Sequence, residues 1–216
     1  MATTGRRASR GVKRAIDIGI ASAGLVVLAP LMALVALGIR TQMGRPVVFR
    51  QMRPGYRGEP FALVKFRTMT EAVEGQPLPA DRRLTRLGLL LRRASLDELP
   101  QLWNILKGDM SLVGPRPLLM EYLPHYTPEE ARRHDAKPGL TGWAQVHGRQ
   151  VLDFEDRFML DVWYVDHWSL WLDLKILAMT ARRVGSGAGL PPVGHAYPEF
   201  SERHQQHVEG PGKDGR

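Results

Sequence analysis

The hydrophobic pattern of the chain begins with an apolar segment that a proline divides. Residues 18–39 carry no ionisable side chain, and as a straight helix they would be roughly 33 Å long, enough to cross the hydrocarbon core of a bilayer. Pro30 lies near the middle of this segment, where it removes a backbone hydrogen bond and favours a break in the helix.

The charges on either side of the apolar segment are balanced. Five basic residues lie between positions 6 and 14, and five more lie between positions 40 and 57. A spanning helix usually shows an excess of positive charge on one side, and this segment shows none. We therefore expect a re-entrant helix–break–helix membrane anchor over residues 15–40, with both ends on one face of the membrane. A spanning helix kinked at Pro30 is the alternative.

Beyond the anchor, the pattern alternates between strand and helix. Two short apolar runs around the turn residues 54–58 predict a β-hairpin within residues 46–68. Helices are predicted over 83–92, from just after Ser95 to near Gly108, over 127–135 with Thr127 as N-cap, and within 152–183 with Ser169 as an internal N-cap. Several of these helices have basic and apolar faces, which indicates either interfacial amphipathic helices or ordinary core packing.

These patterns predict an α+β fold that is mainly helical. It would combine the re-entrant anchor, interfacial amphipathic helices and a small β-hairpin. Composition shifts divide the chain into a basic N-terminal arm (1–14), the anchor (15–40), a folded domain (41–184) and a C-terminal tail rich in Gly, Pro and His (185–216) that we expect to be flexible.

Composition narrows the classes of partner. The formal net charge of the chain is +8 and its pI is about 10.2, so an acidic partner is expected: nucleic acid, anionic lipid or a phosphorylated substrate. The chain contains no cysteine, which excludes disulfides, thiolate catalysis and zinc sites built on cysteine.

The densest group of chemically useful residues lies between Ser95 and Pro117. Ser95 and Glu98 have the spacing of a capping box, and Asp97 would suit the positive end of the helix, so both acids have a structural interpretation. The alternative is a partly buried carboxylate among cations, which acts as a nucleophile or metal ligand opposite a phosphorylated substrate.

Three cations near these acids are candidates for phosphate binding. Arg116 lies between two prolines, so a stiff loop would present its guanidinium, which suits bidentate phosphate binding. Lys65 and Arg67 end the predicted hairpin. The alternatives are a surface turn for the arginine and solvated strand charges for the other two.

Longer motifs carry a resemblance to a known family. The segments Phe49–Gly55, Lys65–Met69, Ser95–Leu99, Leu106–Pro117 and Pro138–Val146 resemble those of the bacterial sugar transferase family, the monotopic polyprenyl-phosphate phosphoglycosyl transferases. Their order and spacing match over roughly residues 12–183. The length of the chain is similar to that of the small members of this family.

The resemblance implies a reaction. Members move a phospho-sugar from a UDP-sugar to a polyprenyl (undecaprenyl) phosphate, giving a polyprenyl diphosphate sugar and UMP, as the first membrane step of a glycoconjugate or polysaccharide pathway. It implies Asp97 as the nucleophile that forms a covalent phospho-sugar intermediate and Glu98 as its assistant. Mg²⁺ is the implied cofactor, with Asp97 and Glu98 as candidate ligands. Lys65, Arg116 and Asp173 fall on further functional positions.

The resemblance also implies a location and partners. The protein would sit monotopically on the cytoplasmic face of the bacterial inner membrane, with UDP-sugar, polyprenyl phosphate and membrane lipid as partners, no nucleic acid, and homo-oligomerisation left open. The helix break of the family often reads Ser-Pro, and here it reads Ala29-Pro30. The competing hypotheses are a catalytically silent membrane scaffold and a basic membrane-tethered nucleic-acid-binding protein. The second leaves the acid pair and the Pro-Arg-Pro loop unexplained.

Overall fold

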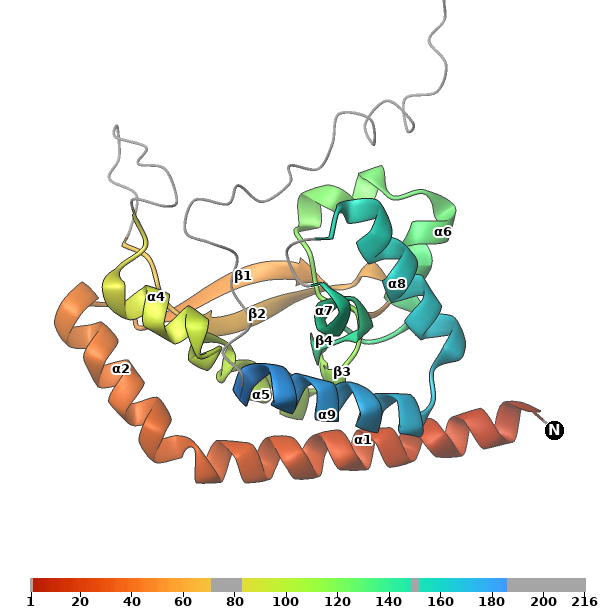
Figure 1. Cartoon of the computed structure of the whole chain (residues 1–216), viewed down its shortest axis with the longest axis horizontal. Helices are drawn as coiled ribbons and strands as arrows, with labels where there is room; N and C mark the ends of the chain where they lie inside the picture. Colours follow the sequence, from red (N-terminus) through yellow and green to blue (C-terminus); the bar gives the residue numbers. More distant parts are fainter. Residues whose placement is uncertain (1, 71–82, 149–151, 186–216) are drawn as a thin grey trace, which may run out of the picture.

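The computed structural model describes residues 2–70, 83–148 and 152–185 (Figure 1). This part of the chain is mostly helical with two small two-stranded sheets, which confirms the predicted mainly helical α+β class. The α-helices are α1 (Ala2–Val27), α2 (Ala29–Met43), α4 (Arg86–Arg93), α5 (Gln101–Lys107), α6 (Pro128–Ala131), α7 (Trp143–His147), α8 (Phe154–His167) and α9 (Leu170–Gly185).

The strands and short 3-10 helices connect these α-helices. The strands are β1 (Val48–Pro54), β2 (Pro60–Phe66), β3 (Ser111–Val113) and β4 (Gly139–Thr141), and the 3-10 helices are η1 (Tyr56–Gly58), η2 (Leu96–Glu98), η3 (Met120–His125) and η4 (Arg132–Asp135). The predicted tail lies, from residue 186 onward, outside the described residues.

The first two helices form the bent pair that the apolar segment predicts. α1 runs along the base of the molecule and α2 rises from its far end (Figure 1). The two helix axes differ by 60°, and Pro30 lies in the first turn of α2, where its missing N–H breaks the helical ladder. Among the described helices none is by itself long and apolar enough to cross a membrane, whereas this pair together meets that test. The anchor remains a prediction, as do the domain limits, since α1 passes residue 14 without a break.

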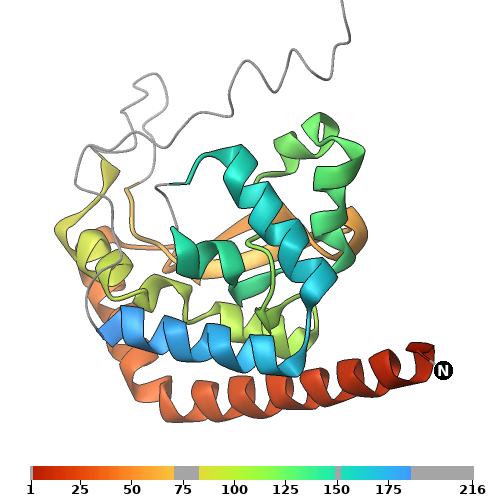
Figure 2. The ribbon, with the colours of Figure 1, turned by 45° about the vertical axis from the view of Figure 1, so that its right-hand side comes forward.

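Polar side chains of α1 attach it to the rest of the protein. Asp17 is buried, and its Oδ1 accepts the backbone N–H of Leu112 at 3.0 Å. Arg14 donates to the carbonyls of Ile105 and Leu106 at 2.5 and 2.7 Å, which satisfies the last carbonyls of α5. The long N-terminal helix is therefore part of the folded core, and Figure 2 shows it alongside α5 and α9.

The predicted hairpin is confirmed. β1 and β2 are antiparallel, with Phe49 opposite Lys65 and Arg53 opposite Phe61. Because side chains alternate along a strand, Lys65 and Arg53 lie on the same face of the hairpin. Buried Asn104 joins this hairpin to α5: its amide nitrogen donates to the carbonyl of Ala62 at 2.8 Å, and its Oδ1 accepts the N–H of Val64 at 3.1 Å.

The helix predicted to start just after Ser95 begins later, and the capping box predicted there is wrong. Ser95 has φ 56°, in the left-handed region, and its side chain makes no capping hydrogen bond. Asp97 and Glu98 lie in the short helix η2, and α5 starts only after Pro100, whose fixed φ suits a helix start. The predicted cap at Thr127 is confirmed: it forms a full capping box with Glu130.

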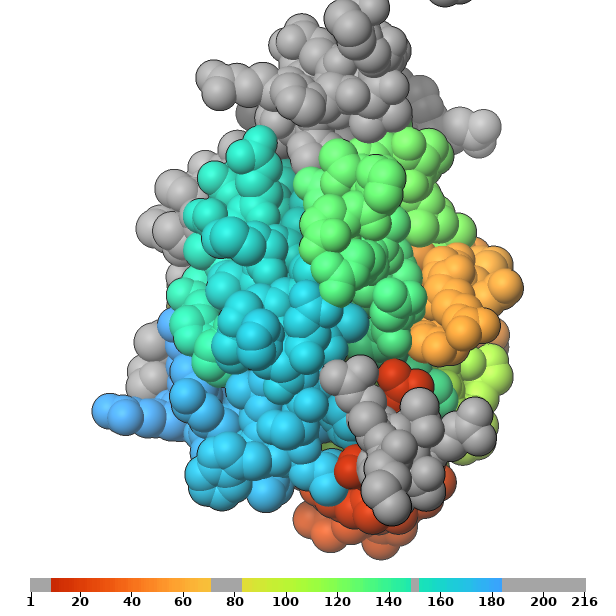
Figure 3. Space-filling model, turned by 90° about the vertical axis from the view of Figure 1, so that its right-hand side faces the viewer, coloured from red at the N-terminus to blue at the C-terminus, as the bar shows by residue number. Residues whose placement is uncertain are grey.

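The C-terminal helical region matches its prediction. Ser169 Oγ accepts the N–H of Leu172 at 3.1 Å, which confirms the internal cap between α8 and α9. Seen from the right of Figure 1, α8 and α9 form one continuous surface above the end of α1, with the hairpin turn at the opposite edge (Figure 3). The parallel pairing of β3 with β4 was not predicted.

Candidate active site

Asp97 lies at the centre of a charged cluster between α4 and α5. Its side chain belongs to η2 and is buried, with only 7% of the residue exposed. No residue of the described ranges donates a hydrogen bond to its carboxylate within ordinary distance. Burial, followed by the negative charge of neighbouring Glu98, raises the pKa of Asp97 above its usual range. A buried carboxylate in this condition is typical of a reactive group.

Three cations from separate elements face Asp97. Lys65 comes from β2, Arg92 from α4 and Arg116 from the loop after β3, and the charge of each opposes the upward shift of the Asp97 pKa. The pKa of Lys65 is itself lowered, first by burial and then by the charge of Arg92. Its Nζ lies 5.3 Å from the centre of the Phe49 ring. The structure therefore brings together Asp97, Glu98, Lys65 and Arg116 from the predicted site residues.

Arg92 is positioned by a close approach of α4 to the end of the hairpin. A Cβ at Gly88 would lie 1.9 Å from the carbonyl oxygen of Thr68, so only glycine fits at this contact. The same approach lets Arg92 Nε donate to Thr68 Oγ1 at 3.0 Å. This hydrogen bond fixes the guanidinium beside Lys65 and Asp97.

Arg116 makes an ion pair with the second acid. Its Nη2 lies 2.5 Å from Glu98 Oε1, and the side chain of Arg116 is 44% exposed. Glu98 is thus neutralised by Arg116, while Asp97 has no such partner at ion-pair distance in the described chain. The two neighbouring acids consequently differ in environment.

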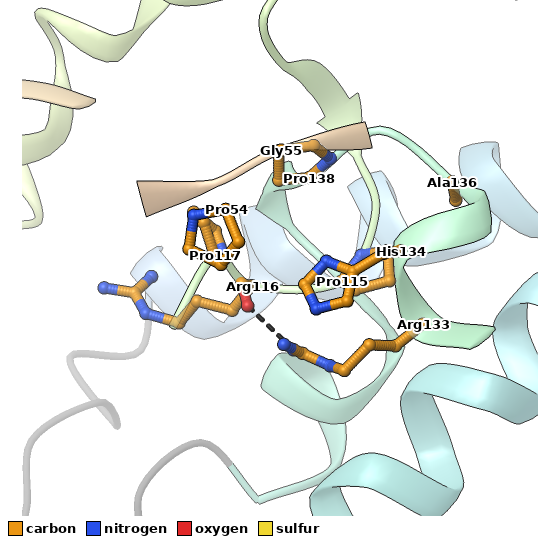
Figure 4. A pocket seen from close by; sticks show the side chains of 9 residues that line it. All are labelled: Pro54, Gly55, Pro115, Arg116, Pro117, Arg133, His134, Ala136 and Pro138. Atoms are coloured by element: carbon orange, nitrogen blue, oxygen red, sulfur yellow. Dashed lines mark hydrogen bonds between the residues drawn. The ribbon is translucent and has the colours of Figure 1, made fainter. Parts of the chain in front are cut away.

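The Pro-Arg-Pro loop is held rigidly by its backbone. The carbonyl of Pro115 accepts the N–H of Gly139 at 2.9 Å, and a Cβ at Gly139 would collide with the backbone of Gly114 at 2.1 Å. The carbonyl of Arg116 accepts Nη2 of Arg133 at 2.8 Å. Figure 4 shows this bond at a small proline-lined pocket, with the Arg116 guanidinium directed away from the pocket. The loop therefore presents its side chain from a fixed backbone, as predicted.

A buried ion pair beneath this loop was missed by the sequence analysis. Arg133 and Asp161 are each 1% exposed, and Arg133 Nη2 lies 2.5 Å from Asp161 Oδ2. Arg133 also donates to the hydroxyl of Tyr126 at 3.3 Å. Arg133 follows Arg132 in an ordinary charged stretch, and no local pattern distinguishes the buried arginine from the exposed one.

Asp173 belongs to a different cluster. Its Oδ2 lies 2.6 Å from Lys13 Nζ and 3.1 Å from Trp168 Nε1, and its Oδ1 accepts the Tyr164 hydroxyl at 2.7 Å. Lys13 also donates to the carbonyl of Val113 at 3.0 Å. These contacts join α1, β3, α8 and α9. The role of Asp173 toward substrate remains a prediction, and its contacts indicate a structural role.

Arg67 contacts the C-terminal end of α2, at its junction with the hairpin. It is 7% exposed, and its guanidinium donates to the carbonyls of Gly44 at 2.9 Å, Arg45 at 3.3 Å and Met43. These bonds satisfy carbonyls at the C-terminal end of α2. They indicate that Arg67 fixes the hairpin to the bent helix pair, and phosphate binding by this residue stays a prediction.

The described side chains at the site supply too few oxygen ligands to hold Mg²⁺ by themselves, so the phosphates of a substrate would have to complete its coordination. In the part of the chain that the structure describes, no group of three or more His, Cys, Asp or Glu side chains could hold a metal ion. Asp97 and Glu98 supply carboxylate oxygens side by side. Mg²⁺ is commonly bound by one or two carboxylates together with substrate phosphates and water, so this pair fits that ion.

A buried carboxylate that several cations face is suited to chemistry on a phosphorylated group, because phosphoryl transfer depends on positioning and on neutralising charge. The sequence model that describes the bacterial sugar transferase family matches residues 8–187 of this chain. The chain therefore belongs to this family.

Three relatives illustrate the range of the family. The chain is 51% identical over 190 residues to an uncharacterised sugar transferase, EpsL, of Bacillus subtilis. The aligned region covers 87% of this chain and 94% of the relative. It is 45% identical over 180 residues to the UDP-glucose:undecaprenyl-phosphate glucose-1-phosphate transferase of Caulobacter vibrioides (78% of this chain, 67% of the relative). It is 39% identical over 198 residues to the undecaprenyl-phosphate galactose phosphotransferase of Salmonella typhimurium (83% of this chain, 41% of the relative).

Proposed function

We propose that this protein transfers a sugar phosphate from a UDP-sugar to undecaprenyl phosphate, releasing UMP and forming undecaprenyl diphosphate sugar. The names of the relatives from Caulobacter vibrioides and Salmonella typhimurium support the acceptor and the reaction class. The observation that carries the proposal for this chain is Asp97: a buried carboxylate with no hydrogen-bond donor in the described ranges and three cations facing it.

The reaction takes two displacements at one phosphorus atom. A carboxylate oxygen of Asp97 attacks the phosphorus that bears the sugar, and the bond from this phosphorus to the bridging oxygen breaks, so that UMP leaves with the bonding electrons. A phosphate oxygen of undecaprenyl phosphate then attacks the same phosphorus, and the Asp97 carboxylate is released. The soluble product leaves before the lipid enters, so one small site serves two dissimilar substrates.

The cations supply the electrostatic stabilisation that phosphoryl transfer needs. Lys65 and Arg92 face Asp97 and would neutralise the oxygens of the phosphorus under attack. Arg116 is bound to Glu98 without substrate, and we expect its guanidinium to exchange this partner for the diphosphate. Glu98, freed by that exchange, and Asp97 would hold Mg²⁺, which when bound supplies further neutralisation of the diphosphate.

The bent helix pair would serve as a monotopic, re-entrant anchor. Apolar side chains at the bend and along α2 are exposed, with Val26 75%, Val27 74% and Leu34 67% exposed. Such side chains are better accommodated in lipid than in water. With both ends on the cytoplasmic face of the inner membrane, the anchor would keep Asp97 where the polyprenyl phosphate headgroup lies. The reaction would then be the first membrane step of a glycoconjugate or polysaccharide pathway.

Release of UMP by the full-length protein in nanodiscs tests this proposal. UDP-glucose, UDP-galactose and other UDP-sugars are offered with Mg²⁺, with and without undecaprenyl phosphate. We expect continuous UMP release with the lipid from at least one sugar, and at most one equivalent per protein without it, because the intermediate then accumulates. Continuous UMP release without the lipid would contradict transfer to undecaprenyl phosphate. No UMP release from any UDP-sugar would contradict the reaction itself and would favour a catalytically silent scaffold.

A further inference from the structure

Two further cations lie near Arg116, and neither is among the main charges that act on Asp97. Arg53 lies one residue before the end of β1, and Arg157 lies in the first turn of α8. Burial lowers the pKa of both residues and the positive charge of Arg116 lowers it further, so Arg53 and Arg157 each lie within electrostatic range of Arg116. Arg116 pairs with Glu98 in the absence of substrate, and once it exchanges that partner the three guanidinium groups would together favour a bound negative group.

The Arg53 guanidinium has one N–H donor without an acceptor among the described residues. One terminal nitrogen donates to Gln51 Oε1 at 2.7 Å, and the other reaches the carbonyl of Pro117 at 3.5 Å, beside the Arg116 loop. Its Nε is buried and has no acceptor among the described residues. Burial, then the charge of Arg116, lowers the pKa of Arg53 to about 10. The guanidinium is therefore held next to Arg116 without a carboxylate in ion-pair contact in the described ranges.

Arg157 and an aromatic pair complete the group. Arg157 lies 5.1 Å over the Phe154 ring, and Phe154 meets the Tyr122 ring edge-on at 5.5 Å. Burial raises the pKa of the Tyr122 hydroxyl, and the charges of Arg53 and Arg157 both oppose that shift, so this phenol lies within electrostatic range of the two arginines. Asp161 acts on Arg157 and is paired with Arg133, and Arg157 Nη2 donates to the carbonyl of Leu152 at 3.3 Å.

The hairpin sets the spacing between this group and Asp97. Lys65 stands opposite Phe49, and Arg53 follows four residues later on the same face, about 13 Å along the strand. The charge of Arg116 lowers the pKa of both Lys65 and Arg53, so its side chain lies within electrostatic range of both. Lys65 and Arg53 can thus reach two adjacent phosphates of one substrate, with Arg116 in contact with both phosphates.

We propose that Arg53 and Arg157, together with Tyr122, form an anion subsite for the phosphate of the departing nucleoside monophosphate. This inference rests on the proposed function and names residues for the nucleotide half of the donor. The start of α8 lies on the side of the molecule away from α1, the helix of the expected anchor (Figure 1). A water-soluble nucleotide is favoured there over the headgroup of a lipid.

Binding of UMP to the full-length protein in detergent, measured by calorimetry, tests the subsite without catalysis. We expect Arg53→Gln to weaken UMP binding about tenfold or more, because it removes charged hydrogen bonds. Arg53→Lys should restore part of the affinity. Arg57→Gln is the matched control: Arg57 is an exposed arginine at the hairpin turn, and it should bind UMP like the wild type. Arg157→Gln gives an independent reading if Arg53→Gln does not fold.

Two further measurements separate the subsite from the other sources of phosphate. Inorganic phosphate as competitor should bind more weakly than UMP. In turnover, Arg53→Gln should raise the KM for the UDP-sugar and leave the KM for undecaprenyl phosphate unchanged. Unchanged UMP affinity in both arginine variants, or an effect only on undecaprenyl phosphate, would overturn the subsite. Because UMP binding needs no turnover, failure of the proposed reaction is distinguishable: the wild type would then bind UMP and release none from UDP-sugars.

Discussion

Asp97 and Asp173 are both buried aspartates close to the start of a helical segment, yet their surroundings differ. Asp173 accepts hydrogen bonds from Lys13, Trp168 and Tyr164, so its charge is fully compensated. Asp97 has cations nearby and no donor in hydrogen-bond contact within the described ranges, and its pKa is raised. The two residues are almost equally buried, at 7% and 6% exposed.

This difference separates a structural carboxylate from a reactive one. A buried charge that is fully hydrogen-bonded holds its neighbours in place, and removing it leaves their donors unpaired. A buried charge without donors lowers the stability of the fold and stays available to a substrate. Both aspartates match motif positions in the sequence, and only the contacts distinguish them.

The largest effect should come from Asp97→Asn. We expect UMP release to fall by at least about 10³-fold, since the amide is a poor nucleophile toward phosphorus. The pKa of Asp97 in the fold lies above its value of 3.8 in the unfolded chain, so stability is lost as the pH rises from that value to the raised pKa, and the loss is complete above it. At neutral pH the thermal midpoint of the variant should therefore be equal to or higher than that of the wild type. A variant that is inactive because it melts at a lower temperature would contradict the comparison.

Asp173→Asn should show the opposite combination. Breaking one side of a buried ion pair leaves Lys13 uncompensated, and the free energy of unfolding should fall by about 3–5 kcal/mol. Urea titration in detergent measures this loss. Turnover per folded molecule should stay within a few-fold of wild type at low temperature. Loss of turnover in a variant of unchanged stability would instead support the substrate-binding role predicted from the sequence.

His134 offers a smaller test of how burial acts on a group without an opposite charge. Burial, then the charge of Arg133, lowers the pKa of His134 from its ordinary 6.5 to about 4. Between these two pKa values, His134 is protonated in the unfolded chain and neutral in the folded protein. The free energy of unfolding therefore decreases as the pH falls from about 6.5 toward 4. Between pH 7 and pH 5 the loss should be about 2 kcal/mol. Urea midpoints at the two pH values measure it, and His134→Asn should reduce the pH dependence. An equal pH dependence in both proteins would exclude His134 as its source.

Local signals predicted the local structure well. The hairpin follows from a Pro/Gly turn between two apolar runs, and the caps at Thr127 and Ser169 are side-chain bonds to amides only three residues away. The capping box predicted at Ser95 was wrong because the Ser-x-x-Glu spacing occurs both in capped helix starts and in other backbone conformations. The left-handed Ser95 and the helix start after Pro100 left Asp97 and Glu98 in a separate short helix.

Long-range contacts explain what the sequence could not predict. β3 and β4 are each three residues long, and their pairing depends on backbone groups 28 residues apart. Arg67 and Arg133 are basic residues in basic stretches, and only the carbonyls and carboxylate that surround them in the fold determine their roles. Of the candidate site, the motifs predicted that Glu98, Lys65 and Arg116 meet at Asp97. Arg92, Arg53 and Arg157 were not predicted as site residues.

The polar bonds of α1 also constrain how the protein is made. Arg14 is bonded to a carbonyl 91 residues later, Asp17 to an amide 95 residues later, and Lys13 to Asp173 after 160 residues. During synthesis the apolar segment leaves the ribosome long before any of these partners exists. If the bent pair is the proposed anchor, the helix would meet the membrane with Lys13, Arg14 and Asp17 still unpaired just ahead of its apolar part. Those charges would keep that end at the lipid surface until the remaining chain arrives, and docking of the core onto α1 would be a late step of folding on the bilayer.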